Sequence, residues 1–270
     1  MPLRNAVDPR RYDINLSILF TELDLLERPS AAAKAGFAAV EFWWPFPDAA
    51  PSEREIDRFA RAVEDAGVSL VGLNFFAGDM PGGERGVLSQ PGRSQEFRDN
   101  VDLAVGLGER LGCRSFNALY GNRIDGSSES EQDGLAVENL RHAAEAVRKV
   151  DGTVLVEPVS GTPAYPLKTA ADAVAVIDRL RAEGANELGL LFDLYHLVVN
   201  GDDPDAVIDE HAHLIRHVQL ADAPGRNEPG TGDIDFERYL GKLDRAGYEG
   251  YIGLEYKPSS TTVDSLTWFD

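Results

Sequence analysis

Cysteine is almost absent from this sequence. Cys113 is the single cysteine among 270 residues, so the chain cannot form an internal disulfide bond, and we expect a cytoplasmic location. Long hydrophobic runs are missing too, since no window approaches the ~20 uncharged apolar residues of a membrane-spanning helix. The opening MPLRNAVDPRRYD has no apolar core and is therefore unlike a secretory signal.

Basic residues are scarce relative to acidic ones. Lysine and arginine number 26 against 46 aspartates and glutamates, which gives a net charge of −20. A field of this sign repels phosphate backbones and anionic lipid surfaces, so we expect neither a nucleic-acid partner nor a membrane partner. Most of these carboxylates are expected to form a solvated surface, with some gathered to hold a cation.

Short apolar runs alternate with amphipathic segments along the whole chain. Eight runs predict strands, several of them continuously apolar, as in a parallel sheet covered on both faces. They span residues 14–19, 38–43, 69–74, 115–119, 153–157, 188–193, 215–220 and 251–255. The segments between them predict helices over residues 23–35, 52–66, 94–111, 129–150, 169–183, 204–211 and 236–246.

Eight strands alternating with helices close naturally into a barrel, and right-handed crossovers place the helices outside it. The alternative is a doubly wound open sheet, which usually has a glycine-rich phosphate loop after its first strand. Residues 17–21 follow the first predicted strand and contain no G-x-G-x-x-G. We therefore predict the α/β class and a single (β/α)8 TIM-barrel domain over residues 1–270, with residues 1–12 as an N-terminal extension.

Oxygen-bearing side chains stand at the ends of four consecutive predicted strands. They are Glu157, Asp193, Gln219 and Glu255, separated by 36, 26 and 36 residues. In a barrel the carboxyl ends of the strands converge on one mouth, where chemistry gathers. Three carboxylates and an amide at one point suit a hard divalent cation, Mg²⁺ or Mn²⁺, with Co²⁺ tolerated. The alternative is that each residue caps the helix that follows its strand.

Histidines lie near this set. His196 follows Asp193 by three residues and is expected to bind the metal or a substrate oxygen, unless it is a structural histidine at a helix start. His211, His213 and His217 lie at a helix end and within a strand, and we interpret them as structural residues.

Two loops rich in glycine and charge, residues 78–92 and 222–233, follow predicted strands on the same face. Each contains an arginine, Arg85 and Arg226, whose planar fork suits a substrate carboxylate, although a solvated surface position is the alternative. Lys257 lies close behind the last strand and is a third candidate cation. A group of aromatic residues after the second strand either walls a pocket or packs under a loop. They are Phe42, Trp43, Trp44 and Phe46.

Two glutamates that approach a metal site from different strands suggest a reaction. A metal that chelates adjacent substrate oxygens acidifies the C–H bond between them by stabilising an enediolate. One carboxylate can remove that proton and the other can return it at the neighbouring carbon. This chemistry is aldose–ketose isomerisation, and Glu157 and Glu255 are the candidate carboxylates for the two proton transfers. Nothing in the sequence signals a nucleotide, a flavin or a nucleophilic cysteine.

The chain contains an ordered set of motifs: G-D-M-P-G-G-E-R-G (78–86), P-G-R-S-Q-E-F-R-D (91–99), V-E-P (156–158), F-D-L-Y-H (192–196), Q-L-A-D-A-P-G-R-N-E-P-G-T-G (219–232) and L-E-Y-K-P (254–258). With these motifs the sequence resembles the hydroxypyruvate isomerase family of the xylose isomerase-like barrels, and the resemblance covers residues 13–270. It implies interconversion of hydroxypyruvate and tartronate semialdehyde, or of a homologue such as a 2-oxo-tetronate.

The resemblance also implies residue roles. Glu157 and Glu255 act as the paired proton donor and acceptor, and both join Asp193 and Gln219 in holding the metal. Sugar-epimerising relatives often have a histidine at the Gln219 position, so a glutamine favours the hydroxypyruvate branch. Further residues match positions expected to contact the substrate. They are His196, Arg226, Asn74, Glu84, Arg85 and Lys257.

The sequence departs from the family pattern beside the expected substrate pocket. Val159 is followed by Ser160 where the family usually has asparagine, the loop over residues 161–166 is short, and W-W-P-F-P (43–47) is unusually aromatic. The substrate is therefore less constrained than the metal site. A neutral-sugar isomerase or 3-epimerase, a metal-assisted abasic-site endonuclease and a non-catalytic sugar-binding barrel are the alternatives, and a homo-oligomer is possible.

Overall fold

A computed structural model describes residues 8–269 of the chain. Eight parallel strands pair in sequence order and close into a barrel, as predicted, because β8 also pairs with β1. The strands are β1 (Tyr12–Asn15), β2 (Ala39–Phe42), β3 (Ser69–Asn74), β4 (Ser115–Asn117), β5 (Thr153–Val156), β6 (Leu188–Asp193), β7 (Ile215–Leu220) and β8 (Ile252–Leu254). The prediction of the (β/α)8 class is therefore confirmed.

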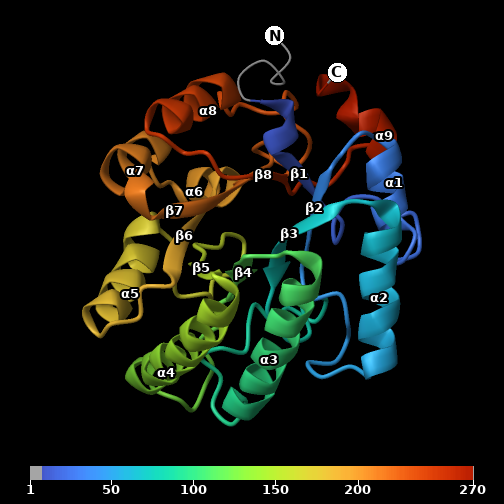
Figure 1. The fold of residues 1–270 in the computed structure, drawn as a ribbon. Coiled ribbons are helices and arrows are strands. Elements are labelled where there is room, and N and C mark those ends of the chain that lie inside the picture. Colours follow the sequence, from blue (N-terminus) through green and yellow to red (C-terminus); the bar gives the residue numbers. More distant parts are fainter. Residues whose placement is uncertain (1–7, 270) are drawn as a thin grey trace.

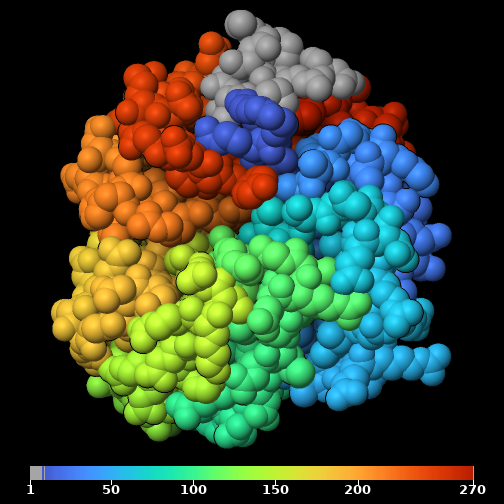
Figure 2. Space-filling model, in the orientation of Figure 1, coloured from blue at the N-terminus to red at the C-terminus, as the bar shows by residue number. Residues whose placement is uncertain are grey.

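Helices surround the strands on the outside (Figure 1). They are α1 (Arg28–Lys34), α2 (Glu53–Ala66), α3 (Ser94–Leu111), α4 (Glu129–Val147), α5 (Ala170–Ala182), α6 (Leu194–Asn200), α7 (Pro204–His211), α8 (Phe236–Arg245) and α9 (Thr262–Ser265). The chain passes round the molecule in sequence order, so its last segments lie beside its first ones (Figure 2). None of the helices in the described part of the chain is long and apolar enough to cross a membrane.

Local signals in the sequence fix several helix ends. Ser52 and Glu55 form a reciprocal capping box, in which Ser52 N donates to Glu55 Oε2 at 2.9 Å and Glu55 N donates back to Ser52 Oγ. Gly67 then ends α2 with a φ of +69°, a left-handed conformation that glycine adopts without a Cβ clash. The helix predicted over residues 52–66 is confirmed with nearly these bounds.

Several elements differ from the prediction, among them α1, β1 and α6. The helix expected over residues 23–35 begins only at Arg28, because Pro29 fits the first turn of a helix and not its interior. β1 ends at Asn15 rather than near residue 19, since the Asn15 side chain accepts a hydrogen bond from Ser17 N and turns the chain into a loop. The short helix α6 was not predicted.

The expected N-terminal extension is only partly described. Residues 1–7 lie outside the described residues, Pro9–Arg11 form a short 3-10 helix, and β1 begins directly afterwards at Tyr12.

The inside of the barrel is polar where β1, β2 and β7 face one another. Glu41 of β2 lies within hydrogen-bonding distance of His217 and Gln219 of β7, two strands that are not neighbours in the sheet. It therefore crosses the barrel interior. Gly253 makes room for it, since a Cβ there would lie 2.8 Å from Glu41 Oε1.

Candidate active site

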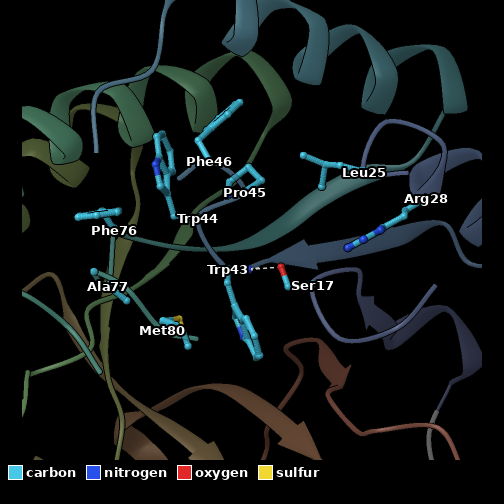
Figure 3. A pocket seen from close by; sticks show the side chains of 11 residues that line it. Ser17, Leu25, Arg28, Trp43, Trp44, Pro45, Phe46, Phe76, Ala77 and Met80 are labelled. Carbon is cyan, nitrogen blue, oxygen red and sulfur yellow. Dashed lines mark hydrogen bonds between the residues drawn. The ribbon is translucent and has the colours of Figure 1, made fainter. Parts of the chain in front are cut away.

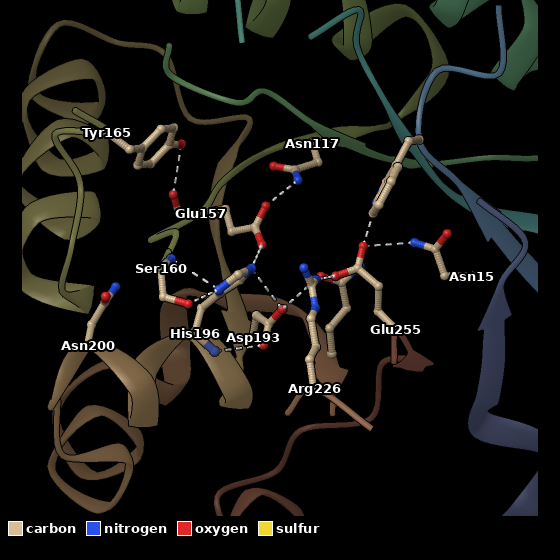
Figure 4. Close-up of polar contacts among 12 residues, drawn as sticks. Asn15, Asn117, Glu157, Ser160, Tyr165, Asp193, His196, Asn200, Arg226 and Glu255 are labelled. Carbon is tan, nitrogen blue, oxygen red and sulfur yellow. Dashed lines mark hydrogen bonds and ion pairs between the residues drawn. The ribbon is translucent and has the colours of Figure 1, made fainter. Parts of the chain in front are cut away.

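Buried carboxylates converge at the mouth of the barrel (Figure 4). Glu157 directly follows β5, Asp193 ends β6 and Glu255 directly follows β8, and all three are at least 95% buried. Potential ligand atoms from these residues and from His196 lie within 4.8 Å of one another. Three of the four strand ends predicted to meet therefore lie together, as the parallel barrel requires.

Glu157 and Glu255 are each held by side chains from other strands or loops. Asn117 of β4 donates to Glu157 Oε2 at 2.7 Å. Asn15 of β1 and the indole N–H of Trp43 donate to Glu255 Oε1, at 3.0 and 2.5 Å. The three donors restrict the rotation of the two carboxylates, so the site is fixed before any ligand arrives.

Asp193 has a second task, because its Oδ1 accepts a hydrogen bond from His196 N at 3.1 Å and caps α6. Its other oxygen faces the site, 3.6 Å from His196 Nε2. The capping alternative and the site prediction are therefore compatible for this residue.

Crowding of the carboxylates makes their ionisation unfavourable. Burial, reinforced by repulsion from Glu255 and Asp193, raises the pKa of Glu157 well above its usual range. Burial also raises the pKa of Glu255 to about 7, although Arg226 opposes the shift. A divalent cation among these oxygens would remove the repulsion and favour the ionised forms.

Gln219, near the end of β7, is the fourth predicted oxygen donor. It is 3% exposed, and its Nε2 donates to Glu41 Oε1 at 2.7 Å. Its Oε1 is buried and has no hydrogen-bond partner among residues 8–269. A buried carbonyl oxygen without a partner is unfavourable unless a ligand satisfies it, and a hard cation would do so. The donor set thus fits a divalent ion bound by Glu157, Asp193, Gln219 and Glu255.

The hydrogen bonds of His196 determine its tautomer. The backbone N–H of Ser160 donates to His196 Nδ1 at 3.0 Å, and Ser160 Oγ lies 2.7 Å from the same nitrogen. Burial lowers the pKa of His196 to about 4, so the ring is neutral near neutral pH. Because Nδ1 accepts, Nε2 carries the proton. This arrangement makes His196 a hydrogen-bond donor toward the site and excludes it as a metal ligand through Nε2.

Arg226 brings positive charge into the cluster. Its guanidinium pairs with Glu255 Oε2, lies 3.8 Å from Asp193 Oδ2 and stacks over the ring of Tyr195 at 5.4 Å. Its backbone φ of +60° is rare for a residue other than glycine and marks a tight turn in the loop after β7. Lys257 N donates to Arg226 O at 2.7 Å and ties this turn to the segment after β8.

A cavity of about 400 Å³ opens above the carboxylates. Three further predicted residues line it: Asn74 at the end of β3, the half-buried Arg85 and the exposed Lys257. Glu84 does not line it. This carboxylate pairs instead with Arg93 at 2.6 Å and accepts from Asp79 N, so its side chain is held outside the cavity lining.

The aromatic residues at and after the end of β2 both wall a pocket and pack against α2. Trp43 lines the main cavity, and it also borders a second cavity of about 230 Å³ (Figure 3). Trp44 and Phe46 point away from Trp43 in that view and stack edge to face at 5.2 Å. Phe42 is buried against Phe59 of α2.

Several contributors to the site lie outside the predicted set: Asn15, Glu41, Asn117 and Ser160. The prediction placed Asn15 and Asn117 within strands but did not include their hydrogen bonds to the carboxylates. Glu41 interrupts the apolar run A-V-E-F, and a charged residue in a buried strand is the signal that could have identified it. His217, interpreted as structural, is the partner of that glutamate.

The fold and the site together define a (β/α)8-barrel protein with buried acidic groups, able to hold a cation, at the carboxyl ends of its strands. The profile of the xylose isomerase-like TIM barrel family matches residues 29–270, and the chain belongs to this family. The resemblance seen in the sequence motifs is confirmed.

Individual relatives narrow the comparison. A Streptomyces coelicolor protein, named provisionally as a hydroxypyruvate isomerase, is 51% identical and covers 96% of this chain and 95% of its own length. The hydroxypyruvate isomerase of Escherichia coli K12 is 35% identical over 96% of this chain and 98% of the relative. A solved structure from Brucella melitensis, titled AP endonuclease, family 2, has a TM-score of 0.85 at 35% identity and covers 96% of this chain and 97% of that one.

Proposed function

We propose that this chain is an isomerase that interconverts hydroxypyruvate and tartronate semialdehyde by proton transfer between Glu157 and Glu255. The observation that carries the proposal is the pair of buried carboxylates that meet at one site from β5 and β8, with the Arg226 guanidinium paired to Glu255. The relatives named as hydroxypyruvate isomerases support the substrate class.

The reaction moves two hydrogens. The C3–H bond of hydroxypyruvate breaks and a C2–H bond forms, while the hydroxyl proton on O3 passes to O2, so the product is an aldehyde with a hydroxyl at C2. One glutamate removes the C3 proton and the other delivers a proton to C2. Without a cation, burial raises the pKa of Glu255 to about 7. The cation proposed below would favour the ionised carboxylates, the form that accepts a proton.

Other residues orient the substrate. The Nε2–H of His196 points toward the carboxylates and can donate to a substrate oxygen, since Ser160 occupies Nδ1. Arg226, Arg85 and Lys257 supply the positive charge that an acid substrate requires. Asn74 offers an amide at the cavity wall.

We propose a divalent cation, Mg²⁺, Mn²⁺ or Co²⁺, bound by Glu157, Asp193, Gln219 and Glu255. Such an ion supplies Lewis acidity that stabilises negative charge developing on the substrate oxygens. Oxygen donors alone suit these hard ions better than Zn²⁺. The exclusion of His196 from the ligand set supports this choice.

The test is a turnover assay on protein stripped of metal with EDTA. It offers hydroxypyruvate, a 2-oxo-tetronate and neutral ketoses, each with and without Mg²⁺ or Mn²⁺, and abasic-site DNA as a separate arm. We expect metal-dependent turnover of an acid. Turnover of ketoses alone would move the protein to the sugar-isomerase branch, and cleavage of the DNA would contradict the proposal.

A variant pair tests the assigned base. Glu157→Gln should reduce kcat by roughly 10²–10⁴-fold, the usual effect of losing a general base. Glu187→Gln is the matched control, because Glu187 lies before β6 at the opposite end of the barrel and pairs with Arg148 on the surface. Equal rates for the two variants would refute the two-glutamate mechanism.

A further inference from the structure

Glu41 is a buried carboxylate beneath the candidate metal site, and the mechanism above assigns it no task. It is 3% exposed, and three side chains surround it. Gln219 Nε2 and Asn15 Nδ2 donate to its Oε1 at 2.7 and 3.0 Å, and His217 Nε2 lies 2.6 Å from its Oε2. A carboxylate that receives two amide donors is an acceptor, so His217 donates as well.

We infer that Glu41 is a positioning residue that fixes the orientation of the Gln219 amide, so that the carbonyl oxygen and not the NH₂ group faces the cation. This inference rests on the proposed metal site. An ionised carboxylate can only accept hydrogen bonds, so the end of the Gln219 amide that faces Glu41 must be the NH₂ group. The opposite end is then Oε1, the atom without a partner in the described part of the chain.

Glu41 links two ligands of the site. Asn15 Nδ2 lies 3.0 Å from Glu41 Oε1 and 3.0 Å from Glu255 Oε1, so the amide bridges the two carboxylates. Glu41 therefore holds Gln219 directly and Glu255 through the Asn15 amide. Outer-shell partners of this kind typically change metal affinity by about 10–100-fold when they are altered.

The arrangement also predicts how a substitution would fail. In Glu41→Gln one carboxylate oxygen is replaced by an NH₂ group, so the donors of Gln219, Asn15 and His217 compete for the one oxygen that remains. When His217 takes it, the introduced NH₂ group faces Gln219, whose amide then turns and presents nitrogen to the cation. Because NH₂ is not a metal ligand, the affinity for the cation falls.

The experiment measures Mn²⁺ binding by electron paramagnetic resonance in the absence of substrate. Glu41→Gln should weaken Mn²⁺ binding at least about 10-fold. Glu187→Gln should bind Mn²⁺ like the wild type. Thermal unfolding in EDTA shows whether each variant is folded, so lost affinity is not confused with lost structure.

A reciprocal exchange gives the sharper readout. In Glu41→Gln/Gln219→Glu the donor and acceptor change places, and the introduced amide can donate to the introduced carboxylate while its oxygen accepts from His217. In Gln219→Glu alone, the introduced carboxylate and Glu41 repel each other, so this single variant should bind Mn²⁺ more weakly than the double variant. The double variant should bind more tightly than Glu41→Gln, and it tests the inference even where that single variant fails to fold.

The possible results distinguish failure of the positioning role of Glu41 from failure of the proposed metal site. Wild-type protein that does not bind Mn²⁺ would remove the metal site and the inference together. Wild-type binding with an unchanged affinity in folded Glu41→Gln would overturn the inference alone.

Metal analysis adds one more outcome, since Asp13 has two buried oxygens without a partner in residues 8–269 and lies close to Glu41 and His217. Two ions per chain, reduced to one by Asp13→Asn, would make Glu41 a ligand and overturn its positioning role.

Discussion

The buried ion pair between His217 and Glu41 predicts a distinct pH dependence of stability. Burial opposes protonation of His217, but the Glu41 carboxylate overcomes this effect and raises the pKa of His217 to about 9, from an ordinary value of 6.5. A raised pKa means that the folded state binds the proton more tightly than the unfolded state. The stabilisation is therefore fully present below pH 6.5 and is lost as the pH rises through 9.

The size of the effect follows from the shift. At 1.36 kcal/mol per pKa unit, the difference between 6.5 and about 9 corresponds to about 3 kcal/mol. Between these two pH values, the free energy of unfolding should fall by up to about 1.4 kcal/mol per pH unit through this group. Such a loss is a large part of the ~5–15 kcal/mol that stabilises an ordinary domain.

The assay is urea unfolding in EDTA, followed by circular dichroism over this pH range, for the wild type and for His217→Gln. The variant keeps a side-chain donor but cannot titrate, so other groups contribute equally to both proteins. We expect the stability difference between them to shrink by about 3 kcal/mol from below pH 6.5 to well above 9. A difference that stays constant across this range would refute the assigned ion pair.

Three further predictions test the substrate site and the fold. Arg226→Ala should raise the KM for hydroxypyruvate roughly tenfold or more, because a charged hydrogen bond to the substrate is lost, and an unchanged KM would remove this residue from substrate binding. Ser52→Ala should lower the free energy of unfolding by about 1 kcal/mol in urea titrations through loss of the capping box, and no change would mean that the cap is not stabilising. Gly86→Ala should destabilise the protein by more than about 1 kcal/mol, since its φ is +108° and a Cβ would lie 1.9 Å from Leu119 O; wild-type stability in the same titrations would contradict this geometry.

Much of the fold could be predicted from the sequence because local signals repeat once per strand and helix. Apolar runs give β6 and β7 with the predicted bounds, and the serine and glycine at either end of α2 limit that helix. The exceptions have local causes. Pro29 shortens α1. The short helix α6 has Asp193 as its N-cap, and this residue was predicted as a metal ligand with helix capping only as the alternative.

The candidate site could be predicted only as far as strand ends are visible in a sequence. A parallel barrel must bring Glu157, Asp193 and Glu255 together once their strands are correctly placed. The supporting hydrogen bonds cannot be read in this way, because they join segments far apart in the chain. Asn15 reaches Glu255 across 240 residues and Gln219 reaches Glu41 across 178. Such contacts depend on which strands face one another inside the closed barrel.

Because β8 pairs with β1, the closed barrel brings side chains from both halves of the chain to the candidate site, and each half has a different role there. The proposed ligands all come from β5 to β8, whereas three of the side chains that hold them, Asn15, Glu41 and Asn117, come from β1, β2 and β4. The second half alone would possess every metal-binding oxygen but lack these supports. We therefore expect the proposed cation affinity to depend on the closed ring, so that Mn²⁺ binding would report on whether the two half-barrels have assembled.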